Sequence, residues 1–269
     1  MFIWIILIII AVFGAIYLFL VSPRLVRKAD MELLKCNYAH RGLWSEDIPE
    51  NSLAAFARAV EAGVGIELDI QLSKDNKIVV FHDSNLKRMC GVDKKISDLT
   101  YDELKQISLG NSLQTIPAFA DVLKLVDGRV PLLIELKGTD LNTDLCKRAA
   151  AMLDKYHGAF CVESFNPYML RWFKKFRPRY ARGQLVTKVT KNDRKGSVIL
   201  NFGLSHMLFN SFSRPDFIAV DFKVRKSFMI FVCEKFFGAS IFAWTIRKQD
   251  EYDTCRDEGL YSIFEKILP

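Results

Sequence analysis

Length, composition and charge narrow the class of protein. The chain has 269 residues, half of them hydrophobic, which suffices for one large domain or two small ones. Its formal net charge of +7 suits anionic partners, either phosphate esters or acidic lipid surfaces. Nucleic acid is not expected, because the sequence has no helix-turn-helix, zinc-finger or RNP pattern.

Residues 1–22 are predicted to form a transmembrane anchor. Met1 to Val21 contains no charge and no proline, and as a helix it would span roughly 30 Å, the thickness of a bilayer core. A cleaved signal peptide would have a basic start, a shorter apolar run and a small-residue cleavage site, none of which is present. A buried core helix would rarely be apolar on every face.

A basic linker, residues 23–35, follows the anchor. Its charges Arg24, Arg27 and Lys28 lie on the C-terminal side of the apolar run, so the positive-inside rule predicts a cytoplasmic folded part in a single-pass membrane protein. The six cysteines form no C-x-x-C pair, and in that compartment we expect reduced thiols. Three disulfides would be the alternative if the folded part lay outside.

Apolar runs then alternate with amphipathic runs through residues 36–269. The strand-like runs are Cys36–His40, Val64–Ile70, Pro131–Leu136, Ala159–Ser164, Ala181–Val186, Asp216–Asp221, Ser240–Ile246 and Leu260–Phe264. The helix-like runs between them include Ser52–Ala62, Pro117–Val126, Asn142–Tyr156, Pro167–Phe176 and Gln249–Glu258. Strand-then-helix alternation with eight strands predicts an α/β fold, the (β/α)₈ or TIM barrel.

One further strand-like run, Lys77–Phe81, breaks the alternation. Only Ser73–Asn76 separates it from the second strand, whereas a parallel crossover needs about a dozen residues. We therefore expect Ile66–Leu72 and Lys77–Phe81 to form an antiparallel hairpin, which would return His82 to the level of Glu67 or Asp69. Residues 84–115 would then be an insertion, either a small lid or an ordinary surface excursion.

Three carboxylates lie inside apolar strand runs. Glu67 and Asp69 are two residues apart and so point to the same side, and Glu135 precedes Lys137 at the same spacing on the next strand. Carboxylates without a nearby cysteine suit Ca²⁺ or Mg²⁺ rather than zinc. A plain ion pair between Glu67 and Lys137 is the alternative, although charges in apolar strands are costly unless they are paired or bind metal.

Two histidines each end a strand-like run and precede a charged residue, His40 before Arg41 and His82 before Asp83. They could be metal ligands, or a base and an acid, because the imidazole pKa is close to neutral pH. Arg41 offers a guanidinium group for phosphate, and Lys137 offers a second positive charge. With a divalent cation, these groups indicate phosphodiester cleavage.

The motifs around these residues resemble a known family. They are His40-Arg41-Gly42, Pro49-Glu50-Asn51-Ser52, Ile66-Glu67-Leu68-Asp69-Ile70, Val79-Val80-Phe81-His82-Asp83 and Ile134-Glu135-Leu136-Lys137. In this order, with Ser164-Phe165-Asn166 and Ala243-Trp244-Thr245-Ile246, they resemble the glycerophosphodiester phosphodiesterase family over roughly Tyr38 to Thr245. The resemblance implies a TIM barrel related to phosphoinositide phospholipase C, and hydrolysis of glycerophosphodiesters to an alcohol and glycerol 3-phosphate.

The resemblance also implies roles for single residues. His40 and His82 would be the acid–base pair, and Glu67, Asp69 and Glu135 would hold one Ca²⁺ or Mg²⁺. Arg41 and Lys137 would bind the phosphate, and Trp244 would lie beside the glycerol. An internal hydroxyl of the glycerol would attack the phosphate first and give a cyclic phosphate. Water would then open this cyclic phosphate. The family's closing T-D pair is missing from Gly259–Lys266, so the resemblance does not extend to what the closing strand adds to the pocket.

Two alternatives remain open at this point. A lysophospholipase D, which takes lysoglycerophospholipids that keep one acyl chain, would use the same residues. A non-catalytic membrane scaffold would not need the full set of predicted site residues.

Two segments could face lipid. Arg171–Arg177 mixes basic with aromatic residues, and Phe228–Phe237 is rich in aromatic residues. Alone, each would be ordinary packing, but beside an anchor we hypothesise that one or both touch an acidic lipid surface and admit lipid-like diesters.

Overall fold

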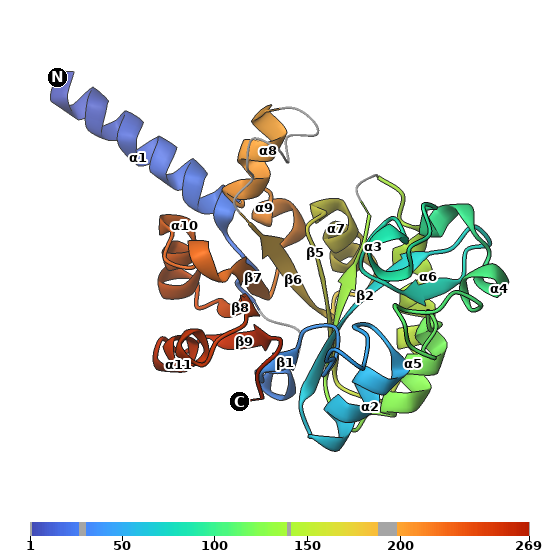
Figure 1. The fold of residues 1–269 in the computed structure, drawn as a ribbon. Coiled ribbons are helices and arrows are strands. Elements are labelled where there is room, and N and C mark those ends of the chain that lie inside the picture. Colours follow the sequence, from blue (N-terminus) through green and yellow to red (C-terminus); the bar gives the residue numbers. More distant parts are fainter. Residues whose placement is uncertain (1, 27–30, 139–140, 188–197, 269) are drawn as a thin grey trace.

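Eight parallel strands close into a barrel in the computed structural model, which describes residues 2–26, 31–138, 141–187 and 198–268 (Figure 1). The barrel closes because β1 pairs with both β2 and β9. The predicted TIM barrel is therefore confirmed. The parallel strands are β1 (Tyr38–Ala39), β2 (Gly65–Leu72), β4 (Leu132–Leu136), β5 (Phe160–Ser164), β6 (Ala181–Val186), β7 (Phe217–Asp221), β8 (Ser240–Ile246) and β9 (Tyr261–Phe264).

Helices surround the barrel, and one long helix, α1 (Phe2–Val21), projects from it (Figure 1). The others are α2 (Leu53–Glu61), α3 (Lys87–Cys90), α4 (Tyr101–Leu104), α5 (Phe119–Val126), α6 (Asp144–Leu153), α7 (Pro167–Phe176), α8 (Val198–Ser205), α9 (Asn210–Ser213), α10 (Phe228–Phe231) and α11 (Gln249–Asp257). A π-helical turn over Val232–Phe236 continues α10. Short 3₁₀ turns cover Glu32–Leu34, Ile96–Asp98 and Phe222–Val224.

The two-residue period of the strands separates the inside of the barrel from the outside. On β2, Ile66, Leu68 and Ile70 pack outward against the helices, in the same buried cluster as Phe56 and Phe119. Glu67 and Asp69 alternate with them and so point inward. The amino-terminal half of the interior is filled by a separate apolar cluster, which includes Leu133, Phe217 and Phe242. The carboxylates therefore lie above an apolar floor, toward the carboxyl ends of the strands.

The predicted hairpin is confirmed. β3 (Ile78–Val80) runs antiparallel to the end of β2, and Leu72 pairs with Ile78. Asn76 adopts a positive φ of 60° in the turn, a conformation that asparagine tolerates well. The Phe81 amide then donates to the Asp69 carbonyl at 3.0 Å, so the chain re-enters the barrel mouth directly before His82.

The segment after the hairpin has an apolar cluster of its own. Leu86, Ile96, Leu104 and Ile116 pack there against Val79 and Phe81 of the hairpin. The Lys74 amide in the hairpin turn donates to the Leu99 carbonyl at 2.8 Å. The described insertion is thus packed against β2 and β3 and supports the hairpin from outside.

α1 is 20 residues long and apolar, and its most apolar window contains no buried residue. By length and composition it can cross a membrane, and a signal sequence would fit the same description. After α1, Arg24 forms an ion pair with Asp216 at 3.2 Å, and Met31 and Leu34 are buried in the amino-terminal cluster of the barrel. Arg27 and Lys28 lie outside the described residues. The described parts of the predicted linker therefore pack against the barrel.

Candidate active site

A cavity of about 200 Å³ opens at the carboxyl ends of the strands. Seven of the residues predicted for the site line it: His40, Arg41, Glu67, His82, Glu135, Lys137 and Trp244. Asp69, the eighth, is buried directly beside them and pairs with Lys137. The structure thus brings together every residue that the sequence assigned to the site.

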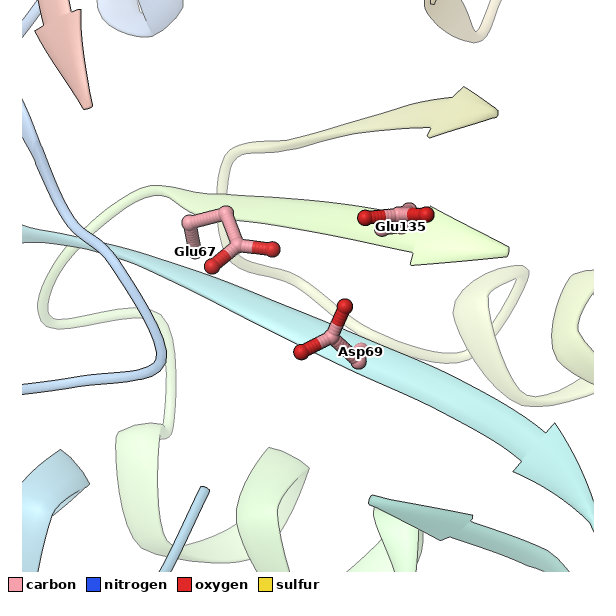
Figure 2. A group of neighbouring side chains, drawn as sticks. All are labelled: Glu67, Asp69 and Glu135. Atoms are coloured by element: carbon pink, nitrogen blue, oxygen red, sulfur yellow. The ribbon is translucent and has the colours of Figure 1, made fainter. Parts of the chain in front are cut away.

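Three buried carboxylates form the centre of the site. Glu67 and Asp69 of β2 face Glu135 of β4 (Figure 2), and one oxygen from each lies within 4.8 Å of the others. Asp69 and Glu135 are direct partners in the β2–β4 register. This is an all-oxygen donor set at a spacing that one hard divalent cation can bridge. The three predicted metal ligands therefore form a group that can bind a metal ion.

The charges around this group favour a divalent cation. Four buried carboxylates, those of Glu67, Asp69, Glu135 and Glu163, face two basic side chains, those of Arg41 and Lys137. Burial, followed by repulsion from its carboxylate neighbours, raises the pKa of Glu67 well above its usual range. Burial raises the pKa of Glu135 to about 7 despite Lys137. A divalent cation would relieve the repulsion among these carboxylates and favour their ionised forms, so the donor set fits Ca²⁺ or Mg²⁺.

Lys137 and Arg41 hold Asp69 ionised. The Lys137 ammonium lies 2.9 Å from Asp69 and 2.8 Å from Glu135. The Arg41 Nε lies 3.6 Å from Asp69, and its backbone N–H donates to Glu67 at 2.8 Å. Burial alone would raise the pKa of Asp69, but Lys137, His82 and Arg41 outweigh it and hold that pKa below its usual range. The pairing of Lys137 with Asp69 and Glu135 replaces the ion pair with Glu67 that was the simpler alternative.

Each histidine is held by a carboxylate, which is itself held by an arginine. His40 Nδ1 donates to Glu265 at 2.8 Å, and Arg247 binds the other oxygen of Glu265. His82 Nδ1 donates to Asp83 at 2.6 Å, and Arg88 binds the other oxygen of Asp83. Because Nδ1 is committed in both rings, Nε2 remains for a substrate. Burial lowers the pKa of both imidazoles, and in each case the carboxylate partner opposes this shift.

The segment Pro49–Ser52 positions three parts of the site at once. Glu50 accepts from Arg41 at 2.7 Å, and Asn51 donates to Asp69 at 2.8 Å. Ser52 caps α2 by accepting from the Ala55 amide. Upstream of this segment, Gly42 has a φ of 82°, and a Cβ there would lie 3.0 Å from Ala55 and Phe56. The turn between His40 and α2 therefore needs glycine at this position.

Glu163 is a site residue that the sequence reasoning missed. It lies on β5 opposite Glu135, is 1% exposed and lines the cavity. Its Oε2 has no hydrogen-bond partner among the described residues. Burial, then repulsion from Glu135 and Asp69, raises its pKa well above the usual range. The signal was present in the sequence, because Glu163 is a charge inside an apolar strand, as Glu67 is.

The closing strand does contribute to the pocket, which corrects the reservation drawn from the missing T-D pair. Glu265 directly follows β9 and contacts His40, and Ile263 of β9 lines the cavity. The sequence could not reveal this contact, because 225 positions separate the two residues.

The other side of the cavity is apolar. Phe165, Leu185 and Trp244 line it together with Ile263. The rings of Phe165 and Trp244 meet edge to face at 5.8 Å. Trp244 therefore lies within an apolar wall of the cavity.

The chain matches the model of the glycerophosphoryl diester phosphodiesterase family over residues 40–265. The chain belongs to this family. It is 35% identical over 158 residues to the glycerophosphodiester phosphodiesterase of Caldanaerobacter subterraneus subsp. tengcongensis, covering 55% of this chain and 65% of that one. Human lysophospholipase D GDPD1 is 35% identical over 52% of this chain and 48% of its own length. The chain thus spans less than two thirds of each of these relatives.

Solved structures of the family share the barrel. The glycerophosphodiester phosphodiesterase of Thermotoga maritima has a TM-score of 0.66 and 27% identity to this chain, covering 86% of this chain and 94% of that one. This family consists of phosphoric diester hydrolases, so the predicted fold and enzyme class are both confirmed.

Proposed function

We propose that the chain hydrolyses glycerophosphodiesters to an alcohol and glycerol 3-phosphate, using one divalent cation and the two histidines. The observation that carries this proposal is the convergence of two carboxylate-held imidazoles on one buried cluster of three carboxylates. Neither a scaffold nor a binding barrel needs this arrangement, since buried charges are costly unless function requires them.

Glu67, Asp69 and Glu135 would hold the cation. When bound, Ca²⁺ or Mg²⁺ would polarise the phosphoryl group and neutralise the charge that builds on its oxygens. Asn51 and the Arg41 amide keep Asp69 and Glu67 in place from outside the cluster. These supporting contacts fix the carboxylates before substrate binds.

His40 and His82 would move the protons. One imidazole takes the proton of the attacking hydroxyl at Nε2, while the other gives a proton to the alkoxide that leaves as the P–O bond breaks. If an internal glycerol hydroxyl attacks, as in the family, the roles reverse when water opens the cyclic phosphate. The anionic diester itself would raise the imidazole pKa values that burial has lowered.

Arg41 and Lys137 would bind the phosphate. Both line the cavity, and both already lie within an acidic cluster that keeps them charged. Burial would lower the pKa of Lys137, but Asp69 and Glu135 outweigh it and raise this pKa. The two side chains therefore remain donors for phosphate oxygens throughout the neutral pH range.

A lysophospholipase D activity is the second candidate. The apolar wall of Phe165, Leu185 and Trp244 favours it, since a simple diester of glycerol has no acyl chain to place there. The similarity to human lysophospholipase D GDPD1 supports it as well.

We also propose that α1 anchors the chain in a membrane by a single pass, with the barrel in the cytoplasm. The length and exposed apolar surface of α1 support the anchor. The orientation rests on Arg27 and Lys28 of the sequence, because Arg24 is committed to an ion pair with Asp216.

The test is turnover of glycerophosphocholine by His40→Ala and His82→Ala variants. We expect each to lose at least ~100-fold in kcat, the low end for acid–base groups. His157→Ala is the matched control, because His157 is exposed and does not line the cavity. Turnover near the wild-type rate in either variant would remove that histidine from its role.

A further inference from the structure

α1 is fixed to the barrel at its carboxyl end. The Val21 carbonyl accepts from Asn210 Nδ2 at 2.9 Å and from Cys233 Sγ at 3.5 Å, and Val21 is fully buried. Asn210 begins α9, and Cys233 lies in the π-helical turn that follows α10. The helix end is thus held between two segments of the barrel wall.

The residues after α1 strengthen this attachment. The Arg24 amide donates to the Pro215 carbonyl at 2.8 Å. The Arg24 guanidinium pairs with Asp216, which is 1% exposed and lies 4.0 Å from buried Arg182. Buried ion pairs of this kind hold a defined geometry, because separating them leaves a charge without a partner. The direction of α1 is therefore set relative to the barrel.

α1 runs antiparallel to β7. Arg24 contacts Pro215 and Asp216, directly before the first residue of β7. Seven positions earlier, Tyr17 stacks on Phe228 at 6.1 Å, and Phe228 begins the helix that follows the carboxyl end of β7. Residues 2–16, all exposed, continue in this direction (Figure 1). They therefore extend past the carboxyl ends of the strands, where the cavity opens.

Exposed aromatic side chains surround the point where α1 leaves the barrel. Phe228, Phe231 and Phe236, on α10 and its π-helical turn, are 69%, 48% and 68% exposed, and Leu200 and Phe202 are exposed on α8. α8 and α10 stand on the same side of the barrel as α1 (Figure 1). Lys223, Lys226 and Lys235 are exposed among them. Aromatic residues mixed with lysines suit the interface between headgroups and acyl chains.

α7 is partly committed to packing, although Arg171, Lys175 and Phe176 on it are exposed. Lys174 donates to the carbonyls of Ser211 and Phe212, and Arg177 pairs with Asp154 at 2.6 Å. Of the two candidate lipid-facing segments, the segment at α10 exposes more aromatic side chains, namely Phe228, Phe231 and Phe236 against Phe176.

The apolar lining of the cavity lies on the same side of the barrel as the attachment of α1. The charged wall of the cavity is formed mostly by side chains on β2 and β4 or after β1, β3 and β4, although Glu163 of β5 and Arg247 after β8 are also charged. The apolar residues Phe165, Leu185 and Trp244 lie on or directly after β5, β6 and β8. α9 and α10, which hold α1, directly precede and follow β7 in the chain, and α8 lies between β6 and α9. A diester with its phosphate on the charged wall would therefore direct an apolar group toward the side where α1 leaves the barrel.

From these observations we infer that the barrel mouth faces the bilayer that contains α1. The aromatic surface of Leu200, Phe202, Phe228, Phe231 and Phe236 rests in the lipid interface. The site then takes its diester from the membrane as a lysophospholipid, with the acyl chain along the apolar wall. This inference rests on the proposed function and narrows its substrate class.

The test uses the full chain reconstituted in phosphatidylcholine vesicles, with Phe228, Phe231 and Phe236 replaced together by serine. Three substrates are compared: long-chain lysophosphatidylcholine in the vesicles, a short-chain lysophosphatidylcholine kept below its micelle concentration, and glycerophosphocholine. We expect kcat/KM for the vesicle-bound substrate to fall about tenfold, as the lost apolar contact with lipid predicts, and the two dissolved substrates to be unaffected. Leu33→Ser, an exposed apolar position before β1 at the amino-terminal end of the barrel, is the control.

The possible failures are distinguishable. If the wild type does not hydrolyse glycerophosphocholine or either lysolipid, the proposed function itself is wrong. If it hydrolyses them but the triple variant retains full turnover of the vesicle-bound substrate, the inference that the barrel mouth faces the bilayer is wrong. Labelling of the wild type by a lipid with a photoreactive acyl chain gives an independent result: label in α8 and α10 as well as α1 supports the inference, and label in α1 alone overturns it.

Discussion

The carboxylate behind each imidazole acts through the histidine that it holds. Glu265 fixes Nδ1 of His40, and the bonds from His40 and Arg247 lower the pKa of Glu265 to about 2 although burial opposes this shift. An ionised carboxylate favours the imidazolium form, so it raises the pKa of His40 against the effect of burial. Glu265 is therefore a positioning residue that also sets the basicity of His40.

Glu265→Gln should separate these two effects. The amide can still accept the bond from Nδ1 but no longer stabilises the imidazolium, so the limb of the pH profile that His40 governs should move to lower pH. We expect kcat to fall about tenfold, within the usual range for acid–base groups and their partners. The measurement is kcat/KM of glycerophosphocholine hydrolysis against pH. Glu61→Gln, exposed on α2, is the control. An unshifted profile would show that Glu265 only fills space.

Burial of the Glu67 carboxyl group lowers the free energy of unfolding at neutral pH. Its pKa is raised in the fold, so stability is greatest below its unfolded pKa of about 4.3 and declines as the pH rises through the folded value. In the absence of metal, Glu67→Gln should therefore increase the free energy of unfolding at pH 7 by about 1 kcal/mol or more, since one pKa unit corresponds to about 1.4 kcal/mol. This gain should disappear near pH 4.

The same variant should lose its response to metal. Ca²⁺ or Mg²⁺ should raise the melting temperature of the wild type, because the ion binds only the folded cluster, and should have little effect on Glu67→Gln. Denaturant unfolding and thermal melts with and without metal measure both effects. A variant that is less stable than the wild type without metal, yet still stabilised by it, would contradict the proposed role of Glu67.

At the scale of elements, the β2–β3 hairpin delivers the second histidine. Gln71 Nε2 donates to the carbonyls of Phe81 at 2.7 Å and Asp83 at 2.9 Å, the residues on either side of His82. Gln71→Leu removes both bonds and should cost about tenfold in kcat through misplacement of the ring. Melting temperatures with metal should show an unchanged metal response. Gln106→Leu, at an exposed position, is the control. If kcat is unchanged, packing alone holds His82.

Local patterns predicted most of this architecture. Seven of the eight predicted barrel strands end within one residue of the observed carboxyl boundary, and the short link at Ser73–Asn76 correctly indicated a hairpin. These features follow from side-chain periodicity and chain length, which are local properties. The first strand is shorter than predicted, Tyr38–Ala39 in place of Cys36–His40, and His40 directly after it binds Glu265. The short helices α8 and α9 carry no clear periodicity and were not predicted, whereas the aromatic run Phe228–Phe237 is helical through Phe236, as expected for an outer barrel helix.

The sequence predicted the site residues that lie in short motifs. It missed the residues that only tertiary contacts bring to the site. His40, Glu67 and Asp69 lie in recognisable short motifs, whereas Glu265 and Arg247 reach His40 only because the barrel closes. Asn51 directly precedes the predicted helix, where asparagine often serves as the N-cap, but Ser52 caps α2 and Asn51 binds Asp69. Which partner a polar side chain takes depends on the neighbouring strands, which no single segment of sequence specifies.

For the molecule as a whole, the attachment of α1 links the membrane to the chemistry. The buried Arg24–Asp216 contact fixes the helix at the amino-terminal end of β7, and the Tyr17–Phe228 contact directs it toward the carboxyl ends of the strands. The carboxylate cluster on β2 and β4 lies across the barrel from β7, where the helix is attached. The fold therefore combines a site for phosphate with an apolar surface on one side of the barrel mouth, along which a lipid substrate would approach.

The most direct test of metal-dependent phosphodiester hydrolysis is turnover of glycerophosphocholine by the full chain with and without EDTA. We expect choline and glycerol 3-phosphate as products in Ca²⁺ or Mg²⁺, loss of turnover in EDTA, and its return when the metal is restored. The same rate before and after chelation, or no hydrolysis by the metal-loaded protein, would contradict the assignment of Glu67, Asp69 and Glu135 as the metal site of this enzyme.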